Sequence, residues 1–183
     1  MVNIKDFARG LKYWLGNYVV NRVPIHAVRV GWLRLMGAHI HARASLQIAV
    51  LVFGPPSRLS IGAETVVNPE VRLDARSGLT IGRNVSISRE VFILTLGHDY
   101  NRADFSLKGL PVVIEDDVWI GIRAVVMPGV TLGRGSVIAA NATVTRDTEP
   151  WGVYVGNPAR KIGERRQQAY DSIYYRPYFG AMT

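Results

Sequence analysis

A single histidine, His98, stands near the start of a segment that interrupts an otherwise periodic sequence. This segment, residues 95–111, reads TLGHDYNRADFSLKGLP. A neutral imidazole suits removal of a proton near pH 7, which makes His98 a candidate general base. The other histidines, His26, His39 and His41, lie before the periodic region or at its weak start. The alternative for a lone loop histidine is a solvated surface side chain.

The elements that would position His98 have a period of six residues. This period fits neither an α-helix nor an alternating strand, and it is typical of a solenoid in which each hexad forms a short strand and a turn. A β-sandwich, the alternative, would alternate at period two. The repeated aliphatic positions are Ile61, Val67, Leu73, Ile81, Ile87, Ile93, Ile114, Ile120, Val126, Leu132, Ile138 and Val144, with a weaker series at Ile40, Leu46 and Val52. Small or aliphatic residues follow four positions later.

The turns of this solenoid are predicted from glycine and asparagine. We expect the glycines after aliphatic positions to supply unusual backbone conformations, and Asn84, Asn141 and Gly129 to adopt left-handed geometry. The glycines in question are Gly62, Gly82, Gly121 and Gly133.

The interruption is an insertion into the solenoid. After Ile81, Ile87 and Ile93 the next aliphatic position is expected at 99, yet it comes at Ile114, fifteen residues later. Insertions of this length in a compact fold are commonly either functional or disordered. We therefore expect an extruded loop over residues 97–111 that carries His98.

Composition narrows the function classes. The 183 residues suit one domain, and the absence of cysteine excludes disulfides, thiolate metal sites and cysteine nucleophiles. The net charge of +8 favours anionic partners, or is a solvated basic surface. No basic run interleaved with aromatics supports nucleic-acid binding. Without an apolar run of about 18 residues or a signal peptide, we expect a cytoplasmic protein that has no transmembrane helix and binds no metal.

The two ends differ from the periodic region. Residues 1–37 predict an amphipathic helix that Pro24 ends and a second helix that ends at Gly37. These helices either cap the open edge of the solenoid or lie on the inner face of the plasma membrane as a peripheral contact. Residues 164–183 predict a C-terminal helix followed by a loose aromatic tail. Residues 38–163 form the main domain.

The segment IEDDVWIGIRAVVMPGVTLGRGSVIAANATVTRDTEPWGVYVGNPARKI, residues 114–162, resembles the hexapeptide-repeat acyltransferases. It is most similar to their sugar and xenobiotic O-acetyltransferase group, which includes galactoside and maltose acetyltransferases. The resemblance implies a mainly β fold, a left-handed parallel β-helix with three hexads per coil. It also implies acetyl-CoA as donor, a homotrimer with active sites between subunits, and acceptors such as bacterial exopolysaccharide or O-antigen precursors.

The resemblance also implies roles for individual residues. His98 falls on the catalytic base, and Asn68 on an asparagine that helps to hold the acceptor hydroxyl. Trp119 falls near the pantetheine thiol, while Gly121 and Ala139 leave room for the pantetheine arm, with a backbone N–H there as oxyanion donor. Arg160 and Lys161 would contact the phosphates of coenzyme A. The alternatives are a turn asparagine, a packing tryptophan and ordinary surface cations.

The resemblance fails around the acceptor. Arg76 stands where the galactoside-type enzymes have an acidic, sugar-contacting residue, so we do not expect a galactoside or maltose acceptor. Asp74 and Asp99 are candidate acceptor contacts, with turn or structural roles as the alternative. Either Glu115 or a backbone carbonyl is expected to orient the imidazole of His98.

We therefore expect an acetyl-CoA-dependent O-acetyltransferase acting on a saccharide hydroxyl. One alternative is an N-acetyltransferase acting on an amino-sugar nucleotide, because the same donor site and base would serve an amine. Another is a non-catalytic structural solenoid. A zinc-dependent carbonic anhydrase of the γ type would need three histidine ligands, and only His98 is well placed.

Overall fold

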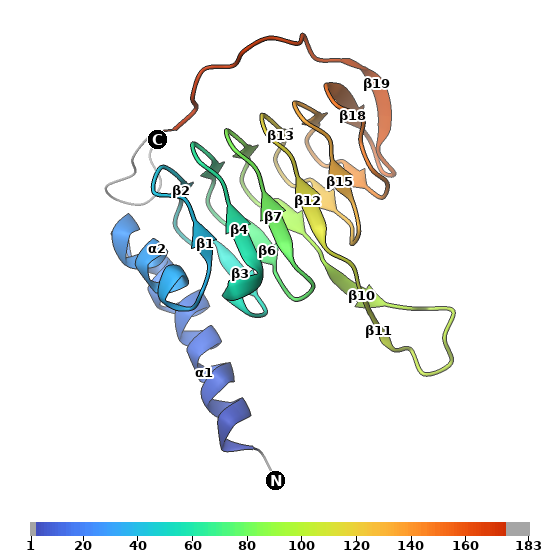
Figure 1. Ribbon diagram of the computed structural model, residues 1–183. Coiled ribbons are helices and arrows are strands. Elements are labelled where there is room, and N and C mark those ends of the chain that lie inside the picture. The colour runs from blue at the N-terminus through green and yellow to red at the C-terminus, as the bar shows by residue number, and fades with distance from the viewer. Residues whose placement is uncertain (1–2, 175–183) are drawn as a thin grey trace.

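Short strands stack into three parallel sheets that form a left-handed parallel β-helix of about six coils (Figure 1). The computed structural model describes residues 3–174. One side of each coil belongs to the sheet β1-β4-β7-β12-β15, the next to β2-β5-β8-β13-β16-β18, and the third to β3-β6-β9-β14-β17. We call these the first, second and third sheets. The predicted solenoid is confirmed.

The bounds of the elements are as follows. The helices are α1 (Ile4–Tyr18), η1 (Val20–Arg22), α2 (His26–Leu35) and η2 (Pro56–Arg58). The first sheet contains β1 (His39–Ile40), β4 (Leu59–Ile61), β7 (Leu79–Ile81), β12 (Val112–Ile114) and β15 (Thr131–Leu132). The second contains β2 (Ser45–Leu46), β5 (Val66–Val67), β8 (Ser86–Ile87), β13 (Trp119–Ile120), β16 (Val137–Ile138) and β18 (Gly152–Val155), with β19 (Arg160–Glu164) antiparallel on its edge. The third contains β3 (Leu51–Phe53), β6 (Arg72–Asp74), β9 (Phe92–Ile93), β14 (Val125–Val126) and β17 (Thr143–Val144).

The repeated aliphatic residues form the core because the register places each of them on its counterpart in the next coil. In the first sheet, for example, Ile61 pairs with Ile81 and Ile81 pairs with Ile114. All the aliphatic positions of the repeat are at most 7% exposed. Burying side chains of this size stabilises a fold by about 1.5–3 kcal/mol each.

The turns confirm one expectation and correct another. Asn84, Asn141 and Gly129 have positive φ angles of 55°, 58° and 82°. Gly82 and Gly121 do not, so a left-handed backbone is not the reason for glycine there. A Cβ added to Gly121 would lie 2.6 Å from the backbone nitrogen of Ala140. Glycine is required because the backbone of the next coil is too close for any side chain.

The N-terminal helices cap the open edge of the first coil. The carbonyls of that coil have no preceding strand to bond, so side chains of the helices supply the donors. Asn17 donates to the carbonyl of Val52 at 2.9 Å and accepts from its N–H at 2.9 Å. Further cap bonds run from Asn21 to the carbonyl of Val50, from Arg29 to that of Leu46 and from Arg34 to that of Ile40, and the N–H of Leu46 donates to Nε2 of His26. The N-terminal helices thus supply hydrogen-bond partners to the rim of the first coil.

The inserted segment is an antiparallel hairpin rather than a structureless loop. Its strands, β10 (Leu96–His98) and β11 (Leu107–Gly109), pair with His98 opposite Leu107. It leaves the coil after β9, at the corner between the third and first sheets, and projects away from the stack (Figure 1). The chain then returns to the first sheet as β12, so the coil register continues.

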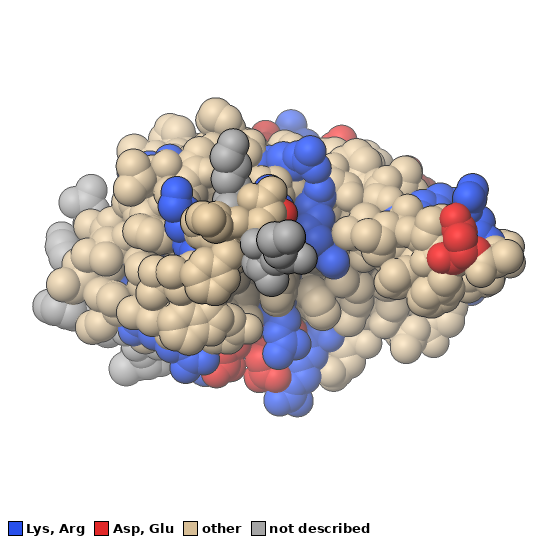
Figure 2. All heavy atoms as spheres, turned by 90° about the horizontal axis from the view of Figure 1, so that it is seen from below, with Lys and Arg blue, Asp and Glu red and all other residues tan. Residues whose placement is uncertain are grey.

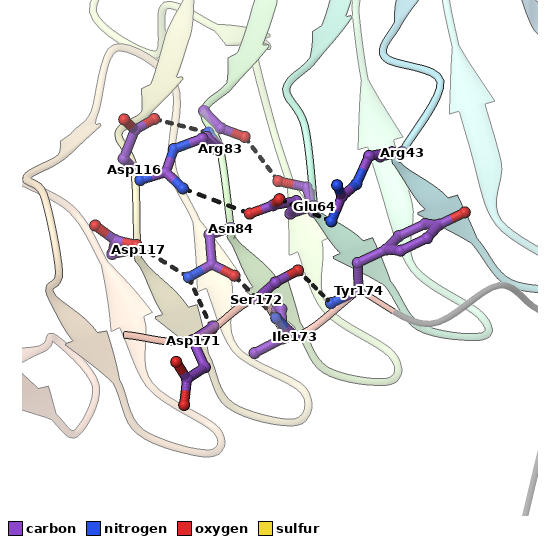
Figure 3. Close-up of polar contacts among 12 residues, drawn as sticks. Arg43, Glu64, Arg83, Asn84, Asp116, Asp117, Asp171, Ser172, Ile173 and Tyr174 are labelled. Carbon is purple, nitrogen blue, oxygen red and sulfur yellow. Dashed lines mark hydrogen bonds and ion pairs between the residues drawn. The ribbon is translucent and has the colours of Figure 1, made fainter. Parts of the chain in front are cut away.

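The C-terminal segment does not form the expected helix. Residues 165–174 run in an extended path back over the corner between the first and second sheets (Figure 3). The amide of Asn84 donates to the carbonyl of Asp171 at 3.3 Å, and its oxygen accepts from the N–H of Ile173 at 3.1 Å. The guanidinium of Arg43 lies 5.7 Å from the centre of the Tyr174 ring. These contacts hold residues 165–174, which we call the C-terminal strap, without helical hydrogen bonds. The rest of the predicted tail lies outside the described residues.

Two further findings concern the described residues 3–174. None of their helices is long and apolar enough to cross a membrane. They also contain no group of three or more His, Asp or Glu side chains placed to hold a metal ion.

Candidate active site

The hairpin presents His98 with one ring nitrogen fixed and the other open. Nδ1 of the exposed His98 ring lies 2.7 Å from the carbonyl oxygen of Phe105. A carbonyl can only accept, so Nδ1 carries the proton and Nε2 of the neutral ring is left as the basic atom. The Phe105 ring stacks on the imidazole at 4.3 Å with an interplanar angle of 7°. The hairpin itself therefore sets both the tautomer and the orientation of the ring.

The two acidic residues considered near His98 are engaged elsewhere. Oδ1 of Asp99 accepts the N–H of Asn101 at 3.0 Å, which closes the turn of the hairpin. Oε2 of Glu115 accepts the N–H of Arg134 at 2.7 Å, in the turn of the next coil. Of the two orienting groups expected from the sequence, the backbone carbonyl is the one in contact with the imidazole.

Four residues form a column at the corner between the second and third sheets. Each follows a strand of the second sheet, and each backbone N–H donates to the adjoining coil. These residues are Asn68, Ser88, Gly121 and Ala139, with N–H to carbonyl distances of 3.0, 2.9, 2.7 and 2.8 Å. We call them the corner column. The column gathers three of the predicted site residues on one edge of the molecule.

Trp119 lies beside this corner column. Its side chain is half exposed, and its indole N–H points to Oγ of Ser88 at 3.4 Å. Another side of the residue lines a cavity of about 240 Å³ that Tyr170 and Ile173 of the C-terminal strap also line. Because Gly121 and Ala139 are small, the surface next to Trp119 is shallow. At Gly121 and Ala139 the corner is therefore a shallow edge next to a large aromatic ring, with the polar side chains of Asn68 and Ser88 further along it.

The amide of Asn68 is held in one orientation. Its Nδ2 donates to the carbonyl of Ile87 at 2.8 Å. Its Oδ1 makes no hydrogen bond within residues 3–174 and so can accept one from a ligand hydroxyl.

The single chain does not bring His98 to the corner column. The hairpin leaves at the corner that follows the third sheet, whereas the column lies at the corner that precedes it. The whole third sheet therefore separates the general-base candidate from Trp119 and Asn68.

The two cations predicted to bind coenzyme A differ in whether a carboxylate of the protein pairs with them. Lys161 forms ion pairs with Glu149 at 2.7 Å and with Glu164 at 3.0 Å, and the hydrogen bonds that it donates to these carboxylates raise its pKa. Arg160 is exposed and donates only to the carbonyl of Ala159 among the described residues. Of the two cations, Arg160 is the one whose charge no carboxylate neutralises.

Asp74 is completely buried and is bonded by the protein itself. Its carboxylate accepts Nε and Nη2 of Arg76, each at 2.9 Å, and the N–H of Thr95 at 3.0 Å. Burial alone would raise the pKa of Asp74, but the hydrogen bonds from Arg76 and Thr95 outweigh it and lower the pKa. Arg76, not Asp74, is the exposed member of the pair, with 43% of its side chain accessible.

The comparisons with known proteins assign this architecture to a family. The family model described as bacterial transferase hexapeptide (six repeats) matches residues 111–146. The putative colanic acid biosynthesis acetyltransferase WcaF of Escherichia coli K12 is 33% identical over 133 residues, which cover 73% of this chain and 72% of WcaF. The chain belongs to the hexapeptide-repeat acetyltransferases.

Other relatives of this family match shorter parts of the chain. Galactoside O-acetyltransferase of E. coli K12 is 35% identical over 126 residues, covering 67% of this chain and 61% of that enzyme. A putative acetyltransferase of Schizosaccharomyces pombe is 45% identical over 87 residues, or 46% of this chain and 42% of the yeast protein.

Solved hexapeptide-repeat acetyltransferases share the whole fold. One from Vibrio cholerae, in complex with acetyl coenzyme A, has a TM-score of 0.79 and 29% identity, covering 91% of this chain and 92% of that one. Galactoside acetyltransferase in complex with coenzyme A has a TM-score of 0.76 and 26% identity, covering 94% and 88%. The chain is thus an acetyl-CoA-dependent acetyltransferase by family.

Sequence reasoning left one feature of the site open and missed two others. It did not identify Phe105 as the residue whose carbonyl contacts His98, because a backbone carbonyl has no side-chain signal. The N–H groups of Gly121 and Ala139, expected as oxyanion donors, are both used in the coil ladder. The N–H of Ile122 has no backbone hydrogen bond within residues 3–174, and only coordinates could show this.

Proposed function

We propose that this protein transfers the acetyl group of acetyl-CoA to a hydroxyl of a saccharide, with His98 as general base. The observation that carries the proposal is the hydrogen bond between Nδ1 of His98 and the carbonyl of Phe105. It leaves Nε2 as the basic atom on an exposed ring at the end of a projecting hairpin. The family supplies the donor, and the named relatives WcaF and galactoside O-acetyltransferase support a saccharide acceptor.

The chemistry follows from this arrangement. Nε2 of His98 takes the hydroxyl proton as the hydroxyl oxygen attacks the thioester carbonyl. The tetrahedral intermediate then collapses, the carbon–sulfur bond breaks, and the imidazolium returns the proton to the sulfur of coenzyme A. Products are the acetyl ester and free coenzyme A. The amide oxygen of Asn68 accepts from a second hydroxyl of the acceptor and thereby holds the attacking hydroxyl in line.

The negative charge on the intermediate requires a hydrogen-bond donor. The N–H of Ile122 lies in the turn directly after Gly121, on the same corner as Trp119. Because this N–H is not used by the coil ladder, we assign it to the oxyanion. Trp119, Gly121 and Ala139 border the pantetheine arm, and Arg160 meets a phosphate of coenzyme A.

The reaction needs groups from two subunits. His98 and the corner column occupy different corners of one chain, so the hairpin of one subunit must reach the column of the next. A closed ring of three identical subunits would complete three such sites.

The experiment that tests this shared site is to co-express His98→Ala and Trp119→Ala variants. Mixed assemblies contain some sites with both residues intact, so we expect turnover to reappear; if both residues act within one chain, it stays absent.

The direct test compares His98→Ala with the wild type in a thiol-release assay. We expect the turnover rate to fall by roughly 10²–10⁴-fold, the range for loss of a general base. His39→Ala, which removes an exposed histidine from the first coil, serves as the matched control. Unchanged turnover in His98→Ala would refute the role of His98. A panel of hydroxyl-only and amino sugars separates O-acetylation from N-acetylation.

The N-terminal helix α1 supports a peripheral contact with an anionic membrane. Its apolar residues remain exposed, although its C-terminal end is bonded to the first coil: Ile4 is 83% exposed, Phe7 63% and Trp14 54%. Arg9 and Lys12 line a groove beside them. Apolar side chains flanked by cations on one helix suit the interface of a bilayer with acidic headgroups.

This contact predicts binding to acidic phosphatidylglycerol vesicles in a sedimentation assay. Binding should be lost in the Phe7→Ser/Trp14→Ser variant. If α1 instead contacts a second copy of the chain, this variant changes the oligomeric mass, and the wild type does not sediment with vesicles. That outcome would refute the membrane contact.

A further inference from the structure

We propose that Arg76 and Arg58 form an anion-binding subsite beside the catalytic hairpin, and that the acceptor is a saccharide carrying a phosphate or carboxylate group. This inference rests on the proposed function and names its substrate class. The subsite is built from a guanidinium that the fold fixes in place, a second guanidinium without a carboxylate partner, and the root of the hairpin.

Arg76 is oriented before any ligand arrives. Asp74, which has no exposed surface, accepts two hydrogen bonds from one edge of the Arg76 guanidinium. Asp74 is itself fixed by the N–H of Thr95. Nη1 of Arg76 makes no hydrogen bond within the described part of the chain, and 43% of the Arg76 side chain is exposed. A positioned guanidinium with free donors suits recognition of a phosphate or a carboxylate.

The stem of Arg76 is also packed in place. A Cβ added at Gly54 would lie 2.7 Å from Cγ of Arg76 and 2.9 Å from its backbone. Gly54 has a φ of 84°, so glycine here serves both the turn and the close approach. No side chain larger than hydrogen would let Arg76 lie as it does.

Arg58 adds a second positive charge next to Arg76. Its Nη1 donates to the backbone carbonyl of Arg76. No ion pair joins Arg58 to a carboxylate among residues 3–174, so its charge is not neutralised by the protein. Because Asp74 already compensates the charge of Arg76, the group of Asp74, Arg76 and Arg58 keeps one positive charge, which a bound anion would neutralise.

The subsite lies at the base of the hairpin that carries His98. Ser77 follows Arg76, and its side chain lies against Gly109 of β11, where an added Cβ would overlap Oγ of Ser77 at 2.1 Å. Gly109 pairs with Leu96, and His98 is two residues further along β10. Two residues of strand span about 7 Å. A saccharide with an anionic substituent can therefore reach Arg76 while one of its hydroxyls meets the imidazole.

Basic side chains gather on the underside of the molecule. Figure 2 shows Lys and Arg in a band across the underside of the molecule, to one side of the projecting hairpin. The groove lined by Arg9 and Lys12, about 570 Å³ in volume, reaches Gly37, and Gly37 lies against Ser57, the neighbour of Arg58. The groove of α1 therefore lies close to Arg58, and Lys12 and Arg58 form no ion pair among residues 3–174, which favours an anionic acceptor approaching from this side.

The test measures acceptor preference with matched pairs of probes. The first pair is p-nitrophenyl β-glucuronide and p-nitrophenyl β-glucoside, which differ in one carboxylate. The second pair is glucose 1-phosphate and methyl α-glucoside. A short-chain polyprenyl-diphosphate hexose distinguishes a lipid-linked phosphate from a soluble one. We expect kcat/KM to be about 10- to 100-fold higher for the anionic member of at least one pair.

Two variants test the residues. Arg58→Gln removes one charge without leaving Asp74 unpaired, and the double variant Asp74→Asn/Arg76→Gln replaces the ion pair by a neutral pair of similar shape. Each should reduce the anionic preference, mainly through KM. Arg83→Gln is the charge-matched control, because Arg83 pairs with Glu64 at a different corner, the one between the first and second sheets, near the C-terminal strap (Figure 3). Retention of the full preference in both test variants would overturn the proposal.

A binding measurement separates this inference from the proposed function. Line broadening of the ³¹P signal of inorganic pyrophosphate reports the subsite without any turnover. Broadening that is present in the wild type and lost in the double variant supports the subsite even if no saccharide is acetylated. Turnover of neutral and anionic probes at equal kcat/KM, with no broadening, supports the acetyltransferase reaction and overturns the subsite.

Discussion

The cap that Asn17 places on the first coil gives the most quantitative prediction. This side chain is 9% exposed and makes two hydrogen bonds to the backbone of Val52, one as donor and one as acceptor. It thereby replaces the strand that a preceding coil would provide. Asn17→Ala removes both bonds and leaves the N–H and the carbonyl of Val52 without partners.

The expected cost follows from these two groups. A buried polar group that loses its partner costs about 1–3 kcal/mol. Water can reach the rim of the first coil more easily than the core, so we expect a total of about 2–4 kcal/mol. For a chain of this size each kcal/mol lowers Tm by about 2–4 °C, so Tm should fall by roughly 4–16 °C.

Thermal unfolding followed by circular dichroism measures this change, and urea unfolding checks it at constant temperature. The control is Asn101→Ala in the exposed hairpin turn, where the side chain makes no hydrogen bond among the described residues. That variant should stay within about 0.5 kcal/mol of the wild type. A Tm shift for Asn17→Ala as small as that of the control would refute the view that side chains replace the missing coil.

Two further predictions concern pH and the hairpin. Because the pKa of Asp74 is lowered in the fold, its carboxylate stabilises the fold above the pKa of the unfolded carboxyl, about 3.9, and this contribution is lost as the pH falls through the folded value. Tm measured against pH should therefore fall less steeply below about pH 4 in Asp74→Asn than in the wild type. Equal slopes would contradict the assignment. Phe105→Ala removes the ring stacked on His98, so kcat should fall about 2- to 10-fold while KM for acetyl-CoA is unchanged. Steady-state kinetics measures this, with Tyr100→Ala, 83% exposed on the same loop, as control.

The periodic part of the fold could be predicted because it repeats. Each aliphatic position has the same environment in every coil, so a local pattern such as Ile61, Ile81 and Ile114 determines the stacking. The length of the insertion and its place after Ile93 followed from the same counting. The hairpin pairing within it did not, because three paired residues on each strand give no periodic signal.

The capped ends and the strap depend on single contacts and were harder to predict. Asn17 and Arg29 are polar residues within amphipathic helices, and nothing in the sequence shows that they donate to carbonyls of the first coil. The predicted C-terminal helix is wrong between residues 165 and 174, because side chains such as Asn84 bond the extended backbone instead.

The sequence offered candidate site residues but not their geometry. Asn68 and Gly121 lie on one corner and Trp119 lies beside it, which follows from the coil register and not from any single motif. Asp74 is buried beneath Arg76 rather than facing an acceptor, because its carboxylate completes the turn before β7. Whether a carboxylate faces inward depends on the corner it occupies, and the repeat does not specify this.

The C-terminal strap changes how this solenoid should unfold. Stacked coils ordinarily interact only with their neighbours, so their ends can fray independently of the middle. Here Arg165 bonds the carbonyl of Asp117 at 2.7 Å in the fourth coil, Asn84 bonds the strap at the third, and Arg43 meets Tyr174 at the first. Detaching any one of these coils therefore strains contacts with the others. A chain built as a one-dimensional array acquires long-range cooperativity from ten residues lying across its outside.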